Sequence, residues 1–474
     1  MTASISEFPH RRAPAGARRW LSWAATALVL AVAAALIANA AQARPAYDAM
    51  GFLVWGQQAL HLSLNLNGAP SWKPLPFLAT APYALFGRAA QEHLWTATSV
   101  FGSLVAVALA GHLAYRLAPR VRGRAWARLV GALFAAYGVA TMGGFFYLAL
   151  IANSDQIVVA LLLGAIECHV AGRRKAALAL LWLATLGRPE AFVFLALYAA
   201  WCWRERALAL QPMTVALLSA PAIWFFVPLF TSKYLLQPSQ FALGQATAIH
   251  GNKLIGVFDR LRTLTALPLQ LAALATILVG LTRRQRPVIW LTAAALLWSL
   301  IELGFALHGF SAVQRYLIEP AAVLMVLVGI GVATALSSTR RPLFGLALVA
   351  VVALIVSLQP FTRTTSRYDH ALISQAHTDA GVLHRLAALI TADGGARRLR
   401  ACGRPYSTLG YQSTVAWYLG LNVGSVYFDP RSAGRSHQPA VLIVPDGLGW
   451  RIRVLHPARA DATACRRLDR SVSA

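Results

Sequence analysis

The chain has 474 residues, of which 58% are hydrophobic and only 13% are charged, and its formal net charge is +26. Soluble domains use about 25% charged residues, so this composition excludes an ordinary soluble protein and predicts an α-helical polytopic membrane protein. The basic residues cluster between apolar segments, which is the positive-inside bias and excludes nucleic acid as a partner. We therefore expect the lipid bilayer to be the first partner of this chain.

Residues 1–19 carry four arginines and lead into an apolar stretch, Trp20 to Ala41, that is long enough to cross a bilayer. Ala-Asn-Ala and Ala-Gln-Ala steps near its end are similar to a signal-peptidase site, but the apolar run is longer than a usual signal sequence. We interpret residues 1–19 as a cytoplasmic segment and Trp20 to Ala41 as a retained first span.

The first outer loop, residues 42–91, carries a carboxylate just outside the first span. Asp48 opens an amphipathic stretch that ends at Leu60, and Lys73 precedes an apolar segment with prolines, Leu75 to Phe86. That segment has only about 12 residues and is too short to cross, so we expect a helix that lies at the interface or dips into it. The pattern indicates a site at the bilayer surface. A simpler alternative is that Asp48 only caps the helix that follows it.

Basic residues bound the following spans and orient them. The second to fourth spans are predicted at Leu94–Leu117, Leu129–Leu150 and Ile157–Ala171. Asp155 lies at the outer side, between the third and fourth spans. Its alternative role is to cap the fourth span.

Residues 176–203 are bounded by basic residues at both ends, so both ends should face the cytosol. The Gly187-Arg188-Pro189-Glu190 break in the middle is then the turn between two short helices. It places Arg188 and Glu190 at depth or near the outer surface, where an ionisable residue is costly unless it lines a cavity. A mutual Arg188–Glu190 pair that caps the two half-helices is the alternative.

The later spans are separated by a polar stretch, residues 231–263, and by short basic segments. They are predicted at Met213–Phe230, Ala266–Leu281, Val288–Leu307, Leu317–Leu336 and Leu343–Leu358. Glu302 lies near an outer end, and His308, Arg315 and Tyr316 belong to the next outer loop. Residues 20–360 then form a transmembrane domain of about eleven spans in the plasma membrane, with the N-terminus cytoplasmic and the C-terminus extracytoplasmic.

Residues 361–474 change character and predict a small extracytoplasmic α/β domain. Helices are expected at residues 371–392 and 413–421, and strands at residues 398–401, 424–428 and 440–444. In an exported domain, Cys402 and Cys465 are candidates for a disulfide. Two unpaired thiols are the alternative.

The ionisable residues without an obvious structural reason all map to the outer ends of spans or to outer loops. They are Asp48, Lys73, Asp155, Arg188, Glu190, Glu302, His308 and Arg315. We expect them to line one shared cavity. A place among the lipid headgroups is the alternative for Arg315.

In their order along the chain, these features resemble the GT-C superfamily of integral membrane glycosyltransferases, in the branch of the protein O-mannosyltransferases and the aminoarabinose transferases. The resemblance rests on the acidic first outer loop, the SWKPLPFLATAPYALFG segment, Asn153-Ser154-Asp155, the Gly187–Glu190 break and Gln314-Arg315-Tyr316-Leu317. It covers about residues 20–360. Asp48-Ala49 stands where the mannosyltransferases have a tandem acidic pair, and Lys73-Pro74-Leu75-Pro76 where His-Pro-Pro is usual.

The resemblance implies that Asp48 is the catalytic acidic residue, that Asp155 is the second acidic position, and that Arg188 and Arg315 face the donor. A sugar on a polyprenyl phosphate would leave its phosphate near Lys73, Arg188 and Arg315. Asp48 would act as general base for the acceptor, with inversion. Glu190, Glu302, His308 and Tyr316 are expected to support the site.

The acceptor class stays open: a cell-envelope glycan, a lipid or a protein. No metal-binding spacing such as CxxC or HExxH occurs, and the need for a divalent metal ion also stays open. Two other functions compete with the transferase. One is a transporter or flippase of a lipid-linked or small polar substrate, which predicts charged groups in both halves of the membrane. The other is a non-catalytic scaffold that presents the C-terminal domain.

Overall fold

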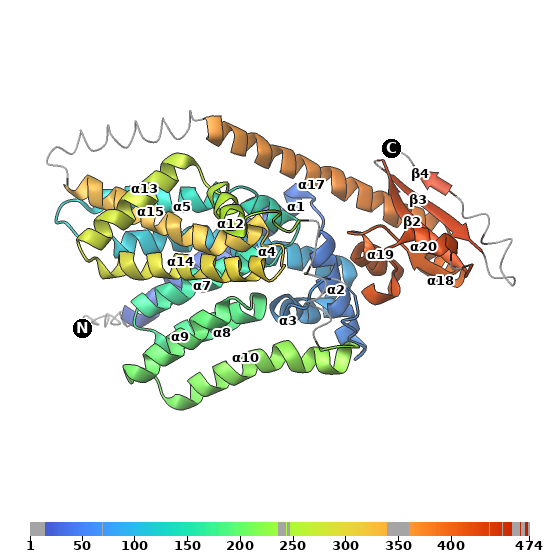
Figure 1. Cartoon of the computed structure of the whole chain (residues 1–474), viewed down its shortest axis with the longest axis horizontal. Coiled ribbons are helices and arrows are strands. Elements are labelled where there is room, and N and C mark those ends of the chain that lie inside the picture. Colours follow the sequence, from blue (N-terminus) through green and yellow to red (C-terminus); the bar gives the residue numbers. More distant parts are fainter. Residues whose placement is uncertain are drawn as a thin grey trace, which may run out of the picture.

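The computed structural model describes residues 15–68, 70–235, 243, 247–338, 360–435, 437–447, 449–456, 465 and 470–472. It has two parts (Figure 1). Long helices lie side by side in a bundle, and a small C-terminal domain sits at one end of that bundle. Helix α17 (Pro360–Ala392) runs along the bundle and into the C-terminal domain, whereas helix α1 (Ala15–Ala41) begins at the opposite end.

Most helices of the bundle follow the predicted apolar runs, and one lies in the stretch 231–263 that was predicted to be polar. The helices of the bundle are α1, α4 (Arg88–Leu117), α5 (Ala125–Ala140), α6 (Phe145–Leu150), α7 (Asp155–Val170), α8 (Arg174–Gly187), α9 (Ala191–Arg204), α10 (Leu210–Thr231), α12 (Lys253–Arg262), α13 (Leu267–Thr282), α14 (Arg286–Leu307) and α15 (Ile318–Ser338). In the described part of the chain, five helices are long and apolar enough to cross a bilayer, or six if α12 and α13, bent by 107°, form one broken span. The predicted number of eleven stays a prediction.

Two predicted spans differ from the structure or fall outside it. The run at 129–150 is not one helix, because α5 ends at Ala140 and α6 begins at Phe145 after Gly144, which has a left-handed φ of 74°. The run at 343–358 lies outside the described residues. The predicted break after Gly187 is confirmed, since α8 ends there and α9 begins at Ala191.

Helix α15 lies at the centre of the bundle and is buried on nearly every side. It packs against α5 through small residues, which allow the two backbones to approach closely. A Cβ atom added at Gly329 of α15 would lie 2.5 Å from the carbonyl oxygen of Gly131 in α5 and 2.7 Å from Cβ of Ala114 in α4. The middle of α15 therefore has a fixed position relative to α4 and α5.

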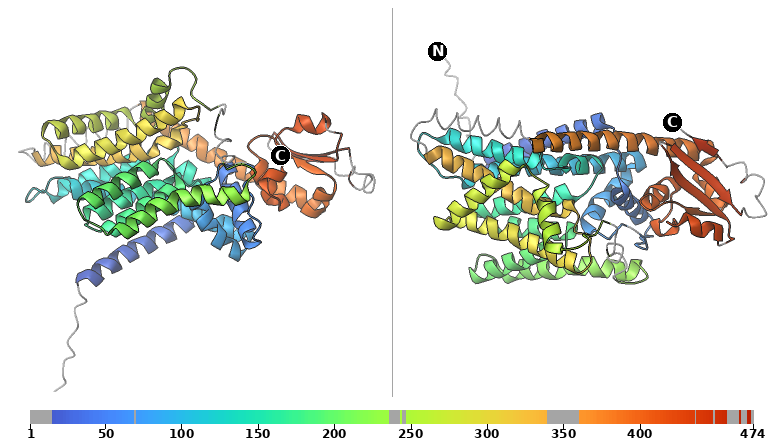
Figure 2. Two further views of the ribbon diagram at one scale, coloured as in Figure 1. Left: turned by 60° about the horizontal axis from the view of Figure 1, so that its bottom comes forward. Right: turned by 45° about the horizontal axis from the view of Figure 1, so that its top comes forward.

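The first loop forms helices α2 (Tyr47–Leu60) and α3 (Pro74–Tyr83), followed by the 3-10 turn η1 (Ala84–Phe86). The predicted helix at 75–86 is thus confirmed. Helix α2 is more enclosed than an interfacial helix, because its large residues Phe52, Leu53 and Trp55 are all fully buried. It lies between the bundle and the C-terminal domain (Figure 2), and its core residues join one apolar cluster with Trp417 and Trp450 of that domain.

The C-terminal domain is an α/β unit, as predicted. Its elements are α18 (Gly395–Ala401), β1 (Arg404–Tyr406), α19 (Gln412–Leu419), η3 (Val423–Ser425), α20 (Pro430–Arg435), β2 (Ala440–Asp446), β3 (Gly449–Leu455) and β4 (Arg470–Val472). The sheet has the order β1-β2-β3-β4, with β1 parallel to β2 and the other pairs antiparallel.

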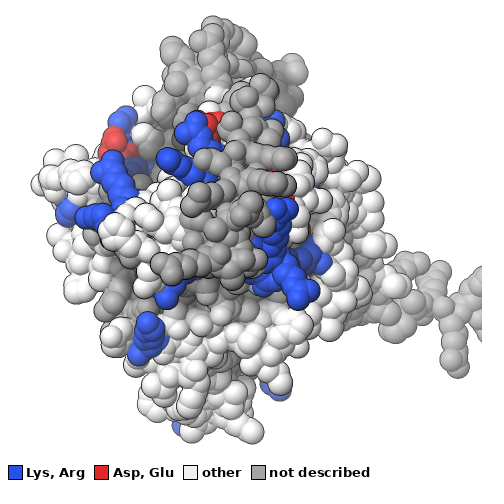
Figure 3. Space-filling model, turned by 90° about the vertical axis from the view of Figure 1, so that its right-hand side faces the viewer, with Lys and Arg blue, Asp and Glu red and all other residues white. Residues whose placement is uncertain are grey.

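Two of the three predicted strands are wrong. Residues 398–401 belong to helix α18, where Leu399 alone turns into the core, and residues 424–428 contain η3 and a single bridge from Tyr427 to Tyr406. The strand at 440–444 is confirmed as part of β2. Figure 3 looks onto this end of the molecule, where basic side chains are spread over the surface and acidic ones are few.

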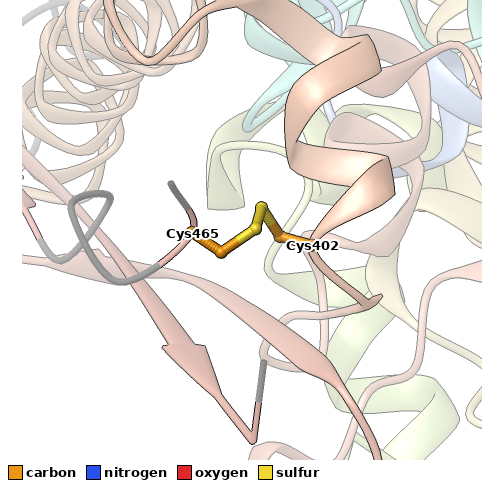
Figure 4. Close-up of a disulfide and its surroundings, with 2 residues drawn as sticks. All are labelled: Cys402 and Cys465. Carbon is orange, nitrogen blue, oxygen red and sulfur yellow. A yellow bond between two sulfur atoms is a disulfide. The ribbon is translucent and has the colours of Figure 1, made fainter. Parts of the chain in front are cut away.

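Cys402 and Cys465 are bonded to each other in the structure, with their Cα atoms 5.7 Å apart (Figure 4). The bond ties the end of α18 to a residue 63 positions later in the sequence. Of the other two cysteines, Cys202 is buried and Cys168 is partly buried in the bundle.

We predict that Gly329→Ala destabilises the protein, because the new Cβ atom would meet the backbone of Gly131 and Cβ of Ala114. Overpacking of this kind costs about 1–3 kcal/mol. The measurement is the thermal unfolding midpoint of the purified chain in detergent. The matched control is Gly304→Ala in α14, where an added Cβ meets no atom within 4 Å, so the better helix propensity of alanine should leave the midpoint unchanged or raised. Equal midpoints for the two variants would contradict the close packing of α5 and α15.

Candidate functional site

The site is built around Asp155, the first residue of α7, whose side chain is completely buried. Its Oδ1 atom lies 2.7 Å from Nη2 of Arg188 and 4.0 Å from Nζ of Lys73, and its Oδ2 atom lies 3.9 Å from Nε of Arg315. A buried carboxylate needs such compensation, because an uncompensated charge in an apolar interior is very costly. One carboxylate thus gathers three cations from separate parts of the chain.

Asp48 meets this cluster from α2. Its Oδ2 atom lies 2.8 Å from Nη2 of Arg315, and the carboxylate is partly open, with a side-chain exposure of 21%. Asp48 is not the N-cap of α2, because Ala46 occupies that position. Ala46 instead donates its backbone N–H to the carbonyl of Ile151 at 3.0 Å, which ties the start of α2 to the loop before Asp155.

Arg188 links the opposite side of the cluster. It lies in the break between α8 and α9, and its guanidinium is 3.7 Å from the carboxylate of Glu190 and 3.6 Å from that of Glu319. The ring of Tyr316 lies 4.0 Å from its Cζ atom, a cation–π contact. The pair of Arg188 with Glu190 exists, but Asp155 is the closer partner.

Two of the loops that deliver charged residues to the cluster, those before Asp155 and Arg315, contain an alanine in the left-handed region. Ala152 has a φ of 60° and Ala312 a φ of 42°, and both are fully buried. Each stands three residues before a member of the cluster, Asp155 or Arg315. Residues other than glycine adopt this conformation rarely and at a cost, so the surrounding packing must impose it.

A cavity of about 430 Å³ opens beside the cluster. Its charged end is formed by Lys73, Arg188, Glu190 and Glu302, and Tyr316 lies with them. The rest of its wall is apolar and aromatic, with Trp72, Trp224, Phe225, Pro228, Phe305 and Phe310. Within the described residues, Nζ of Lys73 is buried and has no hydrogen-bond partner. At the end of this apolar hollow, the cavity therefore has an ammonium group that lies 4.0 Å from Asp155 but donates no hydrogen bond to any described residue.

The structure brings together eight of the nine residues predicted for the site. His308 is the exception, because it is exposed at the end of α14 and its ring stacks on Phe310 at 6.1 Å. His308 and Arg315 belong to the same outer loop, but His308 lies at the end of α14 and its ring packs against Phe310 rather than against the cluster. Glu319 was not predicted to belong to the site, although a carboxylate four residues after Arg315 in an apolar span is a signal in the sequence.

Asp48 is held ionised by its neighbours. Burial alone would raise the pKa of its carboxyl, but the Arg315 guanidinium and the Lys73 ammonium outweigh burial and hold that pKa below its usual range. Arg315 is thus a partner that a bound anion would have to share.

The sequence left the need for a divalent ion open, and the described residues show no preformed set of ligands for one. In the described parts of the chain, no three His, Cys, Asp or Glu side chains converge to hold a metal. Asp48 and Asp155, the two carboxylates nearest to Lys73 and Arg315, face cations instead. What the arrangement can do is bind an anionic group with Lys73, Arg188 and Arg315 and accept a proton at Asp48.

No known protein family and no curated protein sequence matches the chain. Solved structures, in contrast, do match it. The crystal structure of ArnT from Cupriavidus metallidurans bound to undecaprenyl phosphate is similar with a TM-score of 0.56 over 89% of this chain and 93% of that one, at 13% sequence identity. The apo structure of the same protein is similar with a TM-score of 0.57 over 90% of this chain and 93% of that one, also at 13% identity. The fold expected from the predicted resemblance is thereby confirmed, and this chain has the fold of ArnT.

Proposed function

We propose that the protein is a membrane glycosyltransferase that moves a sugar from a polyprenyl phosphate to an acceptor at the outer face of the plasma membrane. The observation that carries the proposal is an apolar cavity with Lys73 and Arg188 at its end, beside the cluster in which Arg315 pairs with the partly open carboxylate of Asp48. That ArnT, which shares the fold, binds undecaprenyl phosphate supports this choice of donor.

The shape and charge of the cavity suit such a donor. An isoprenoid tail needs an apolar wall, and the aromatic residues around Trp224 and Phe305 supply one. The phosphate needs cations in a site shielded from water, where their stabilisation of developing charge is largest. Lys73 and Arg188 line the cavity, and Arg315 reaches the same cluster through Asp155.

The reaction then follows from the positions of these groups. The acceptor oxygen attacks the anomeric carbon from the side opposite the phosphate, and Asp48 takes the acceptor proton. The bond from the anomeric carbon to the phosphate oxygen breaks, and its electron pair leaves with the polyprenyl phosphate. The cations stabilise that leaving group, and the anomeric configuration inverts. Asp155 keeps the cations in place and does not itself transfer a proton.

We predict that Asp48→Asn leaves a folded, membrane-inserted protein but lowers transfer by about 100-fold or more, the range that a general base contributes. The measurement is transfer of radiolabelled sugar from a purified polyprenyl-phosphate sugar, compared with the thermal unfolding midpoint. Asp446→Asn, which removes an exposed carboxylate paired with Arg451 in the C-terminal domain, is the control and should retain full transfer. Full activity of Asp48→Asn would overturn the assignment of the base.

The pH dependence should differ between the free enzyme and the donor complex. The pKa of Asp48 lies below its usual range in the free protein because Arg315 and Lys73 are close. A bound phosphate shares these cations, so the pKa of Asp48 rises in the complex. Since kcat/KM for the donor reports the free enzyme and kcat reports the complex, the acid limb of kcat should lie at higher pH than that of kcat/KM. Coincident limbs, or the reverse order, would argue against a cation shared between Asp48 and the phosphate.

Arg260 is a positioning residue for Arg315. Its guanidinium, on the amphipathic helix α12, donates to the backbone carbonyls of Ser311 and Ala312, the latter at 2.7 Å. These carbonyls lie in the strained loop that leads to Arg315, and Gln314 of the same loop donates to Thr263 at 3.2 Å. Side-chain hydrogen bonds from Arg260 and from Gln314 therefore hold this loop against α12.

We predict that Arg260→Ala lowers turnover by about tenfold to 100-fold, because small misplacements of a charged group near the reacting atoms have effects of this size. The control is Arg262→Ala on the same helix, which removes only an exposed pair with Asp259 and should leave turnover unchanged. Turnover at saturating donor is measured for both variants, together with hydrogen exchange of the loop at 308–317. Normal turnover of Arg260→Ala with a loosened loop would show that the position of Arg315 does not limit the reaction.

A further inference from the structure

A second and larger cavity, of about 640 Å³, lies between the bundle and the C-terminal domain. Its walls come from the last turn of α1, the first turns of α4, and helices α17 and α19. It shares no lining residue with the cavity at Lys73. It is therefore a separate hollow that needs a separate explanation.

The lining of this cavity is basic. It contains Arg44 and Arg88 together with three histidines, His93, His377 and His384, and Glu92 is the single carboxylate among the lining residues. Glu92 is already paired with Arg44 at 2.8 Å. His377 and His384 stand seven residues apart, two turns along α17, and so lie on one face of that helix. The uncompensated charge on the walls is positive.

Arg88 is the strongest anion-binding candidate. Among the described residues it has no carboxylate partner. Nη1 donates to the carbonyl of Trp417 at 3.0 Å and Cζ lies 5.2 Å from the Trp417 ring. The Trp417 contacts fix the guanidinium in place, while its charge and remaining donors stay available.

Tyr418 adds a second donor. Its hydroxyl oxygen is buried, lines the same cavity and has no hydrogen-bond partner in the part of the chain that the structure describes. Burial and the neighbouring carboxylate of Glu92 raise the pKa of Tyr418 to about 12, so the hydroxyl keeps its proton and can donate. A buried polar atom without a partner is uncommon in folded proteins and points to a ligand or a water at that position.

The place of the cavity along the helices identifies the kind of ligand. Ala38 and Asn39 belong to the last turn of α1, which ends at Ala41, and Arg88 and Glu92 belong to the first turns of α4. The cavity thus lies where two apolar helices end, at the level of lipid headgroups. The C-terminal domain also has the charge to approach an anionic surface, since residues 361–474 contain fifteen arginines, seven aspartates and no lysine or glutamate.

We propose that this cavity binds the phosphate group of an anionic lipid headgroup, held by Arg88, His384 and the Tyr418 hydroxyl, and that the bound lipid joins α1 and α4 to the C-terminal domain. The inference does not depend on the proposed transferase activity. The site would stabilise the contact between the two parts of the protein, because a ligand that binds only the folded state raises its stability.

The test uses the full chain in a neutral detergent, with its thermal unfolding midpoint measured against increasing dihexanoyl phosphatidylglycerol. We expect a saturable rise in the midpoint, and no rise with dihexanoyl phosphatidylcholine. In Arg88→Gln, the loss of a charged hydrogen bond should raise the apparent Kd for phosphatidylglycerol by about tenfold or more. His377→Gln combined with His384→Gln is a second variant that leaves α4 untouched and should weaken binding as well.

Arg453→Gln is the control for charge, because it removes one exposed arginine of the C-terminal domain that lies outside this cavity, and it should bind as the unaltered chain does. Equal weakening by Arg453→Gln and Arg88→Gln would overturn the proposal in favour of diffuse charge attraction. An equal rise with phosphatidylcholine would also overturn it. A full rise with inorganic phosphate at the same concentration would overturn the assignment to a lipid.

Discussion

The structure depends on the cost of placing a carboxylate in an apolar interior. Asp155 is fully buried at the start of α7, and the cations of Lys73, Arg188 and Arg315 all lie within 4.0 Å of its oxygens. Removal of one partner from such a network leaves a charge that the interior cannot solvate. Three loops, from distant parts of the sequence, are therefore fixed relative to one another by one side chain.

This network explains why residues with strained backbone conformations occur in the loops before Asp155 and Arg315. Ala152 and Ala312 adopt left-handed conformations three residues before Asp155 and Arg315. Each conformation costs free energy that the packing around the site must supply. Hydrogen bonds from Arg260 to the carbonyls at 311 and 312 show one source of that constraint.

The C-terminal domain takes part in the same construction. Helix α2, which carries Asp48, is enclosed by aromatic residues from the bundle and by residues of α19, and Gln58 of α2 is hydrogen-bonded to Asn422. Asp48 therefore rests on a helix held from both sides, and the position of its carboxylate depends on both parts of the protein. The basic cavity at Arg88 lies along this same junction.

The sequence by itself determined the class of protein, nearly all helix positions in the bundle, and the gathering of ionisable residues at one end, because long apolar runs and the placement of charges report directly on the bilayer. It also predicted the pairing of Cys402 with Cys465. It wrongly predicted strands at residues 398–401 and 424–428, where the structure has helix α18 and the turn η3, because a small sheet is stabilised by contacts between distant segments and short local patterns are ambiguous. Only the tertiary structure decided that Arg188 pairs with Asp155 more closely than with Glu190, that Glu319 joins the cluster and that His308 does not. Such choices depend on distances across three or four separate helices, and no local pattern in the chain encodes those distances.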